Sequence, residues 1–263
     1  MVMLVDSHCH LDRVALKPYA GDFRRLMDET RAAGVGHMLC VSIDLEHYPQ
    51  MRNLVEPYPW VSVSVGVHPS ERGRRDPTPE VLVELAQDAR NVAIGETGLD
   101  YYRSTGNLGW QHQRFRDHIA AAKLCGKPLI VHTREARQDT LRILTEEAAR
   151  DVGGVLHCFT ETWEMAKAAL DLGFYISFSG IVTFKTADDL QAVAAKVPRD
   201  RLLIETDSPY LAPVPHRGKS NEPRFVAAVA QCIAELRGMS AEELAALTRD
   251  NFFCLFKDAV PAD

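Results

Sequence analysis

Eight short apolar runs, rich in β-branched residues, alternate with longer helical patterns along almost the whole of this chain. The runs cover residues 2–6, 37–43, 60–66, 91–96, 127–132, 153–159, 174–180 and 201–206. Strands that alternate with helices form right-handed βαβ units around a parallel sheet. Eight such units predict an α/β fold of the (β/α)8 TIM-barrel type, with a doubly wound open sheet as the alternative.

Helical patterns separate these runs, and glycine marks several of their ends. The patterns lie at 23–34, 80–90, 111–126, 140–150, 163–173 and 187–197. Gly34, Gly126 and Gly173 stand at C-terminal ends, where glycine commonly ends a helix. The final stretch, 240–256, predicts one more helix with an aromatic tail packed on the barrel. Because no Pro/Gly/Ser-rich linker divides the chain, we expect a single domain over residues 1–263.

Charge and cysteine content narrow the class of protein. The formal net charge of -6 argues against a broad basic surface for nucleic acid, but bound metal ions could still create a small local site. Six scattered cysteines without a CxxC motif predict free thiols in a reducing compartment. The chain shows no signal peptide and no apolar stretch of roughly 20 residues, so we expect a cytoplasmic protein without membrane contact. Nothing in the sequence indicates an interface, so we also expect a monomer.

Polar side chains gather where the predicted strands end. They are His8, His10, His68, Glu96, His132, His157 and Asp207, which end or follow the first, third, fourth, fifth, sixth and eighth runs. The carboxyl ends of barrel strands form one active-site face, so we expect these distant residues to meet at one mouth. Imidazoles and carboxylates are metal ligands, and a glutamate among them can bridge two ions about 3.5–4 Å apart.

Each of these residues also has a structural interpretation. A single histidine such as His132 can be a hydrogen-bonded structural residue, Glu96 can cap the following turn, and Asp207 precedes a Ser-Pro turn. Their joint position at C-terminal strand ends favours a metal site. Asp6 lies one pleat deeper than His8, so we expect it to be a hydrogen-bond partner rather than a ligand.

These motifs resemble those of the TatD family of metal-dependent deoxyribonucleases and hydrolases, over essentially the whole chain. The matching segments are DSHCHLD (6–12), GVHP (66–69), GETGLDYY (95–102), VHTRE (131–135), LHCFTE (156–161), SFSGIVTFK (177–185), ETDSPYLAP (205–213) and GKSNEP (218–223). Within the family, HCFTE and LAPVPHRGK make the chain look closest to the YcfH-type branch. The resemblance implies a TIM barrel and cleavage of phosphodiester bonds in DNA, often from a 3′ end.

The resemblance also implies roles for individual residues. One divalent ion would be bound by His8, His10, Glu96 and Asp207, and a second by Glu96, His132 and His157. His68 would contact the phosphate or help a proton transfer, and Glu205 would be an acidic partner of Asp207. Mg²⁺, Mn²⁺ and Zn²⁺ all suit oxygen and nitrogen ligands of this kind, so the identity of the two ions stays open.

The expected reaction is attack on phosphorus by a metal-activated water. Asp207 or Glu205 would accept its proton, and the choice between them stays open because both lie on one face of the eighth strand. We expect Arg134 and Lys185 to hold phosphate, and Tyr101 either to stack on a base or to pack its loop. The expected partner is therefore a DNA strand end or another phosphodiester.

Two other functions fit part of the pattern. The same water could cleave another ester or an amide, such as an aminoacyl ester at a tRNA 3′ end. Related barrel amidohydrolases bridge their metals with a carboxylated lysine, whereas here the fourth strand ends in Glu96 with no lysine nearby. The other alternative is a non-enzymatic barrel that keeps its metal for stability. Replacing Glu96 would then damage folding, whereas in an enzyme it would remove activity.

Overall fold

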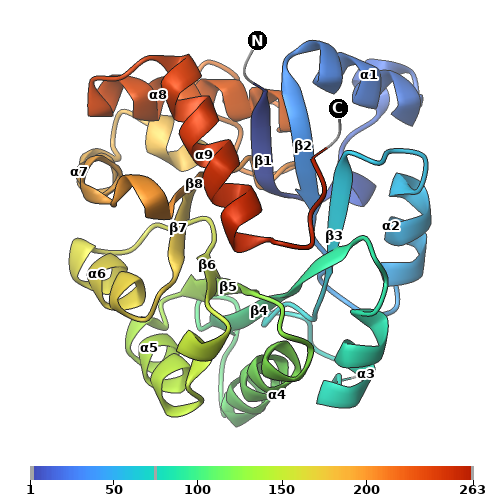
Figure 1. The fold of residues 1–263 in the computed structure, drawn as a ribbon, viewed down its shortest axis with the longest axis vertical. Coiled ribbons are helices and arrows are strands. Elements are labelled where there is room, and N and C mark those ends of the chain that lie inside the picture. The colour runs from blue at the N-terminus through green and yellow to red at the C-terminus, as the bar shows by residue number, and fades with distance from the viewer. Residues whose placement is uncertain (1–2, 74–75, 262–263) are drawn as a thin grey trace.

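A computed structural model describes residues 3–73 and 76–261, and within them eight parallel strands form one sheet in the order β1 to β8. The strands are β1 Leu4–Cys9, β2 Val35–Cys40, β3 Val61–Val65, β4 Asn91–Asp100, β5 Leu129–Arg134, β6 Gly154–Leu156, β7 Tyr175–Phe178 and β8 Leu202–Ile204. Helices surround them (Figure 1). The predicted TIM barrel is confirmed; residue 2 of its first predicted strand lies outside the described residues.

Backbone hydrogen bonds connect the first strand to the segment after the last. Asp207 N donates to His8 O at 2.9 Å, and His10 N donates to Ser208 O at 2.8 Å. Cys9 and Ser208 form a parallel bridge between these donor and acceptor pairs. The ring of strands is therefore joined at its carboxyl end, where the predicted ligands lie.

Helices connect the strands along the outside of the barrel. They are α1 Phe23–Ala32, α2 Tyr48–Val55, α3 Pro79–Leu85, α4 Gly109–Cys125, α5 Arg137–Glu146, α6 Trp163–Asp171, α7 Asp188–Lys196, α8 Val226–Arg237 and α9 Ala241–Leu255. The sequence patterns had not delimited α2 or α8. Of the helices in the described part of the chain, none is long and apolar enough to cross a membrane.

The last helix closes the amino end of the barrel. Phe252 of α9 and Phe256, which follows α9, pack against apolar side chains of the sheet. These side chains are Val5, Leu39, Val41, Val92, Ala93, Ile130, Val155, Tyr175 and Leu203. Asn251 donates through Nδ2 to Leu202 O at 2.8 Å, which fixes α9 at the start of β8. Figure 1 shows α9 lying across the strands. The predicted packing of the C-terminal helix on the barrel is thus confirmed.

Strand β4 runs further than the sequence pattern indicated. The fourth strand was expected to end at Glu96, but it continues to Asp100 because it keeps pairing with β5. The pairing shifts register between Ile94 and Thr97. Such an irregularity re-aims side chains locally, and here Glu96 N donates across the barrel to Ser42 O at 3.0 Å.

Candidate metal centre

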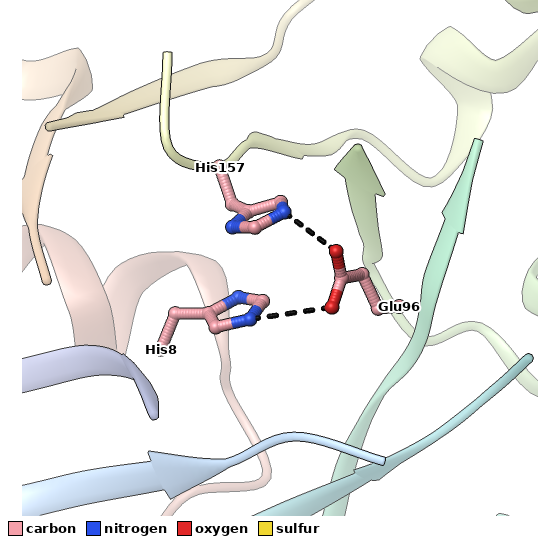
Figure 2. Close-up of side chains that lie close together, drawn as sticks. All are labelled: His8, Glu96 and His157. Atoms are coloured by element: carbon pink, nitrogen blue, oxygen red, sulfur yellow. Dashed lines mark hydrogen bonds and ion pairs between the residues drawn. The ribbon is translucent and has the colours of Figure 1, made fainter. Parts of the chain in front are cut away.

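Glu96 lies at the centre of a polar cluster at the carboxyl end of the barrel, and its two oxygens face different histidines. Oε2 is 3.5 Å from His8 Nε2 and 3.9 Å from His10 Nε2. Oε1 is 2.8 Å from His157 Nε2 and 3.2 Å from His132 Nδ1. Figure 2 shows the rings of His8 and His157 side by side, both directed at this carboxylate. One carboxylate oxygen therefore faces His8 and His10 and the other faces His132 and His157, while His8 and His157 also lie close enough to bind one ion together with Glu96.

The first group brings Asp207 to the two histidines of β1. Asp207 Oδ1 is 3.4 Å from His10 Nε2 and 3.8 Å from His8 Nε2, and the two Nε2 atoms are 3.3 Å apart. A tetrahedral ion with Zn–N bonds of about 2.0–2.1 Å keeps its ligand atoms about 3.3–3.4 Å from each other. These three donors are therefore spaced as the ligands of one small ion.

The outward ring nitrogens show which nitrogen of each histidine can bind a metal. His10 Nδ1 is 2.9 Å from Val41 O, an atom that can only accept, so the neutral ring leaves its lone pair on Nε2. His157 Nδ1 lies 3.3 Å from the carboxylate of Glu205, and its Nε2 lies 2.8 Å from that of Glu96, so a bond from Nδ1 to Glu205 would leave Nε2 for a metal. A ligating histidine typically makes such a bond through its other nitrogen. The residues present thus fit divalent metal ions.

Asp100 contacts the ring nitrogen of His132 that faces away from Glu96, as Glu205 does for His157. Sequence reasoning missed this role of Asp100. Its Oδ2 is 3.3 Å from His132 Nε2, and neither atom has a hydrogen-bond partner elsewhere in the described residues. The contact directs the lone pair of Nδ1 toward Glu96. The signal was the spacing of four residues between Glu96 and Asp100 on one strand face, which was hidden because the strand was expected to end at Glu96.

His68 also belongs to the cluster, but it differs from the other histidines in the proton that its Nε2 carries. Its Nε2 is 3.2 Å from Glu96 Oε1, and its ring lies beside that of His132 with centroids 4.5 Å apart. Ser70 N donates to Nδ1 at 3.0 Å, so the proton of the neutral ring is on Nε2. Burial lowers the pKa of His68, which keeps the ring neutral. His68 therefore offers a hydrogen-bond donor to the site rather than a lone pair.

Both central carboxylates are ionised. Burial alone would raise the pKa of Glu96, but the histidines around its carboxylate, chiefly His68 and His157, hold that pKa well below its usual value. Burial also opposes ionisation of Asp207, yet its contact with His10 lowers the pKa of Asp207. Metal ligation requires carboxylates in this form.

Two further acidic residues support the cluster from behind. Glu205 is completely buried, and its Oε1 accepts a hydrogen bond from Cys158 N at 2.9 Å beside His157 Nδ1. Asp6 accepts bonds from Thr206 N at 2.8 Å and Thr206 Oγ1 at 2.6 Å, so it ties β1 to the segment after β8. Asp6 lies outside the donor groups around Glu96.

Of the two tyrosines that follow β4, Tyr101 packs its loop, which is one of its two expected roles. The hydroxyl of Tyr101 donates to Asp139 Oδ2 at 2.7 Å and lies 2.6 Å from His112 Nε2, so this half-buried ring packs its loop. Tyr102 is instead 60% exposed. The guanidinium carbon of Arg134 lies 3.8 Å from the centre of the Tyr102 ring. The two tyrosines could not be distinguished from the sequence because strand pairing orients them.

The two sides of the mouth differ. A cleft of about 480 Å³ follows β4 to β6 and is lined by Tyr101, Glu135, Ala136, Arg137, Gln138, Asp139 and Glu161. Charged groups there pair with each other, as Arg137 does with Glu161 at 2.6 Å. On the other side Lys185 is exposed after β7. Tyr210, which sequence reasoning missed, is 49% exposed three residues after Asp207.

Known proteins with similar sequences include metal-dependent hydrolases and an exonuclease. The family model of TatD related DNase matches residues 5–257. The chain is 51% identical over 256 residues to "Uncharacterized metal-dependent hydrolase YcfH" of Escherichia coli K12, covering 97% of this chain and 96% of that protein. It is 34% identical over 246 residues to "3'-5' ssDNA/RNA exonuclease TatD" of Edwardsiella piscicida, covering 91% and 95%. The predicted resemblance is confirmed.

A solved structure agrees with the sequence comparisons. The crystal structure of YjjV, a TatD homologue from Escherichia coli K12, superposes with a TM-score of 0.86 at 28% identity. The match covers 98% of this chain and 99% of that one. The chain thus belongs to the family of TatD-related DNases, and it is a metal-dependent hydrolase with a TIM-barrel fold.

Proposed function

We propose that this protein hydrolyses phosphodiester bonds at the 3′ end of single-stranded nucleic acid, using two divalent ions. The observation that carries this proposal is the Glu96 carboxylate, whose oxygens face two separate groups of donors. Ions that share one carboxylate stand about 3.5–4 Å apart, a common arrangement in enzymes that cleave phosphate esters. The Edwardsiella relative is named as an exonuclease of single-stranded DNA and RNA, which supports the same substrate class.

Two sets of side chains would hold the ions. They are His8, His10 and Asp207 for one ion and His132 and His157 for the other, with Glu96 between them. Divalent ions, when bound, supply Lewis acidity that lowers the pKa of water and neutralises charge on phosphate.

The remaining steps fall to protein groups. The side chain of Asp207 is 15% exposed, whereas Glu96 is 3% and Glu205 is 0% exposed, so Asp207 is the carboxylate that can accept the proton of an attacking water. Glu205 instead fixes the ring of His157. His68 directs its Nε2 proton into the site, where it can bond a phosphate oxygen or the leaving oxygen.

The test is cleavage of a single-stranded oligonucleotide carrying a label at its 5′ end. The metal-depleted protein is assayed alone and with Mg²⁺, Mn²⁺ or Zn²⁺ added back, beside Glu96→Gln. Glu242→Gln, the same change at an exposed position on α9, is the control. We expect stepwise shortening that requires both metal and Glu96. Metal binding without cleavage of any phosphodiester would overturn the proposal and direct the search to other ester or amide substrates.

A further inference from the structure

Three exposed cations stand together on the loops that follow β7 and β8. They are Lys185, Arg217 and Lys219, which we call the basic ridge. In residues 3–73 and 76–261, none of the three takes part in an ion pair. The nearest carboxylates along the chain are Asp188 and Asp189, in the first turn of α7, and Glu222. Asp188 and Asp189 make no salt bridge to the ridge, and Glu222 pairs with Arg224. The basic ridge therefore presents uncompensated positive charge.

Contacts between the two loops hold the ridge in place. Val214 N donates to Thr183 Oγ1 at 2.8 Å. The guanidinium carbon of Arg217 lies 4.1 Å from the centre of the Phe184 ring. A Cβ atom on Gly180 would come within 2.1 Å of a carbonyl oxygen in the β8 loop, so only glycine permits this close approach. The cations are thus arranged before any ligand arrives.

An exposed aromatic ring, Tyr210, lies beside the metal centre on the segment after β8, which also carries Arg217 and Lys219. Tyr210 is 49% exposed, and its backbone N donates to Asp207 O at 2.9 Å. Its ring centroid is 6.1 Å from that of His10, a member of the first donor group. Asn221 donates through Nδ2 to Tyr210 O at 2.6 Å and fixes this segment. The ring is held at the edge of the site with an open surface.

Most cations on the opposite side of the mouth are already engaged. Arg137 pairs with Glu161 at 2.6 Å, and Arg142 pairs with Asp139 at 2.8 Å. Arg134 lies against the ring of Tyr102. Arg103, after β4, is also exposed and makes no ion pair within the described residues, but it stands there as a single cation, whereas three such cations lie on the β7 and β8 side.

We infer that single-stranded nucleic acid reaches the metal centre across the basic ridge, with one base stacked on Tyr210. The ridge would bind phosphates several nucleotides from the reacting bond, and Tyr210 would hold the strand between them. Phosphate contacts with cations and base contacts with aromatic rings are how sequence-independent sites bind single strands. This inference rests on the proposed function, because it describes how the substrate of that function would reach the metal centre.

The ridge is tested by binding, so that cleavage is not required. The probe is a fluorescent oligothymidylate of about twelve nucleotides with phosphorothioate linkages, which matches the length of a single-strand site. Its anisotropy is followed at several salt concentrations with wild type, Arg217→Gln/Lys219→Gln and Arg150→Gln/Lys257→Gln. The last variant removes two exposed cations at the opposite end of the barrel and so makes the same change in net charge.

The two parts of the path should respond differently. Arg217→Gln/Lys219→Gln loses two phosphate contacts, so its slope of log K against log salt should be lower in magnitude than that of wild type by about 1.4, since each contact contributes about 0.7 for single strands. Tyr210→Leu should weaken binding about tenfold and leave that slope unchanged, whereas Tyr210→Phe should bind as wild type does. The variant Arg150→Gln/Lys257→Gln should match wild type in both quantities.

The outcomes separate this inference from the proposed function. Binding that depends on the ridge and on Tyr210, without cleavage of unmodified strands, would support the path and contradict the phosphodiesterase activity. Equal salt slopes for the two double variants would overturn the path even if strands are cleaved. A polyglutamate peptide of similar length that binds as tightly, with the same loss in Tyr210→Leu, would also overturn it, because the surface would then recognise charge in a protein partner.

Discussion

At the scale of single residues, the site depends on side chains that never touch the substrate. Asp100 is the clearest case, because it contacts the His132 nitrogen that faces away from Glu96. We expect Asp100→Asn to weaken metal binding about 10–100-fold, the usual effect of removing such a partner. Calorimetric titration of the metal-depleted protein measures this, with Asp28→Asn on α1 as the control. Unchanged affinity would show that His132 is oriented by packing alone.

The choice between two neighbouring carboxylates is a second question at this scale. Glu205 accepts a backbone hydrogen bond from Cys158, which a glutamine oxygen can also accept, so we expect Glu205→Gln to lower kcat/KM about tenfold. Asp207→Asn removes both a proposed ligand and the proton acceptor, and we expect a loss of at least about 100-fold. Steady-state rates on the same oligonucleotide decide the matter. Equal losses would make Glu205 a direct participant in proton transfer.

At the scale of elements, helix α4 stabilises the segment after β3 through a buried histidine. Val67 N donates to His118 Nε2 at 3.0 Å, and His118 Nδ1 lies 2.7 Å from Arg114 O. Burial lowers the pKa of His118 from 6.5 to about 4. Protonation at Nε2 would remove the acceptor of Val67. The folded protein therefore resists a proton that the unfolded chain takes up.

The consequence for stability has a definite sign. The contribution of His118 to the free energy of unfolding is complete above its unfolded pKa of 6.5. It is lost as pH falls from 6.5 to about 4, and the total loss is about 3 kcal/mol. We expect His118→Gln, which can still accept from Val67 N, to reduce the decline in unfolding free energy between pH 7 and pH 5. Urea unfolding of both proteins at each pH provides the measurement. Effects of metal on stability are common to wild type and His118→Gln. Parallel pH profiles of the two proteins would therefore refute the assignment of this pH dependence to His118.

Elements were predictable where their periodicity was simple. The strands and seven of the nine α-helices in the described residues follow patterns that can be read locally. In contrast, α8 is apolar on several faces, and α2 has only eight residues, with a proline in its first turn. The extension of β4 depends on pairing with β5, which no local pattern in TGLD reveals. The ligand-type residues were found because barrel topology gathers strand ends. Asp100 and Tyr210 were missed, and Tyr101 could not be distinguished from Tyr102, because their positions depend on neighbours distant in sequence.

At the scale of the whole molecule, the two ends of the barrel serve different purposes. The metal centre lies at the carboxyl end of the strands, and the aromatic side chains of α9 fill the amino end. In TIM barrels the first end carries function and the second carries stability. A change at the amino end should therefore alter the free energy of unfolding without altering the chemistry at the mouth.

Phe252 allows this separation to be tested directly. Its ring is completely buried inside the barrel, so we expect Phe252→Ala to lower the free energy of unfolding by about 3–5 kcal/mol through lost burial and a cavity. At temperatures well below unfolding, its kcat/KM should stay within about twofold of wild type, since the cavity lies at the far end from Glu96. Glu96→Gln should show the reverse, with activity lost and the fold kept. Urea unfolding and rates measured on both variants test the pair; a proportional loss of activity in Phe252→Ala would mean that packing at the amino end sets the geometry of the metal centre.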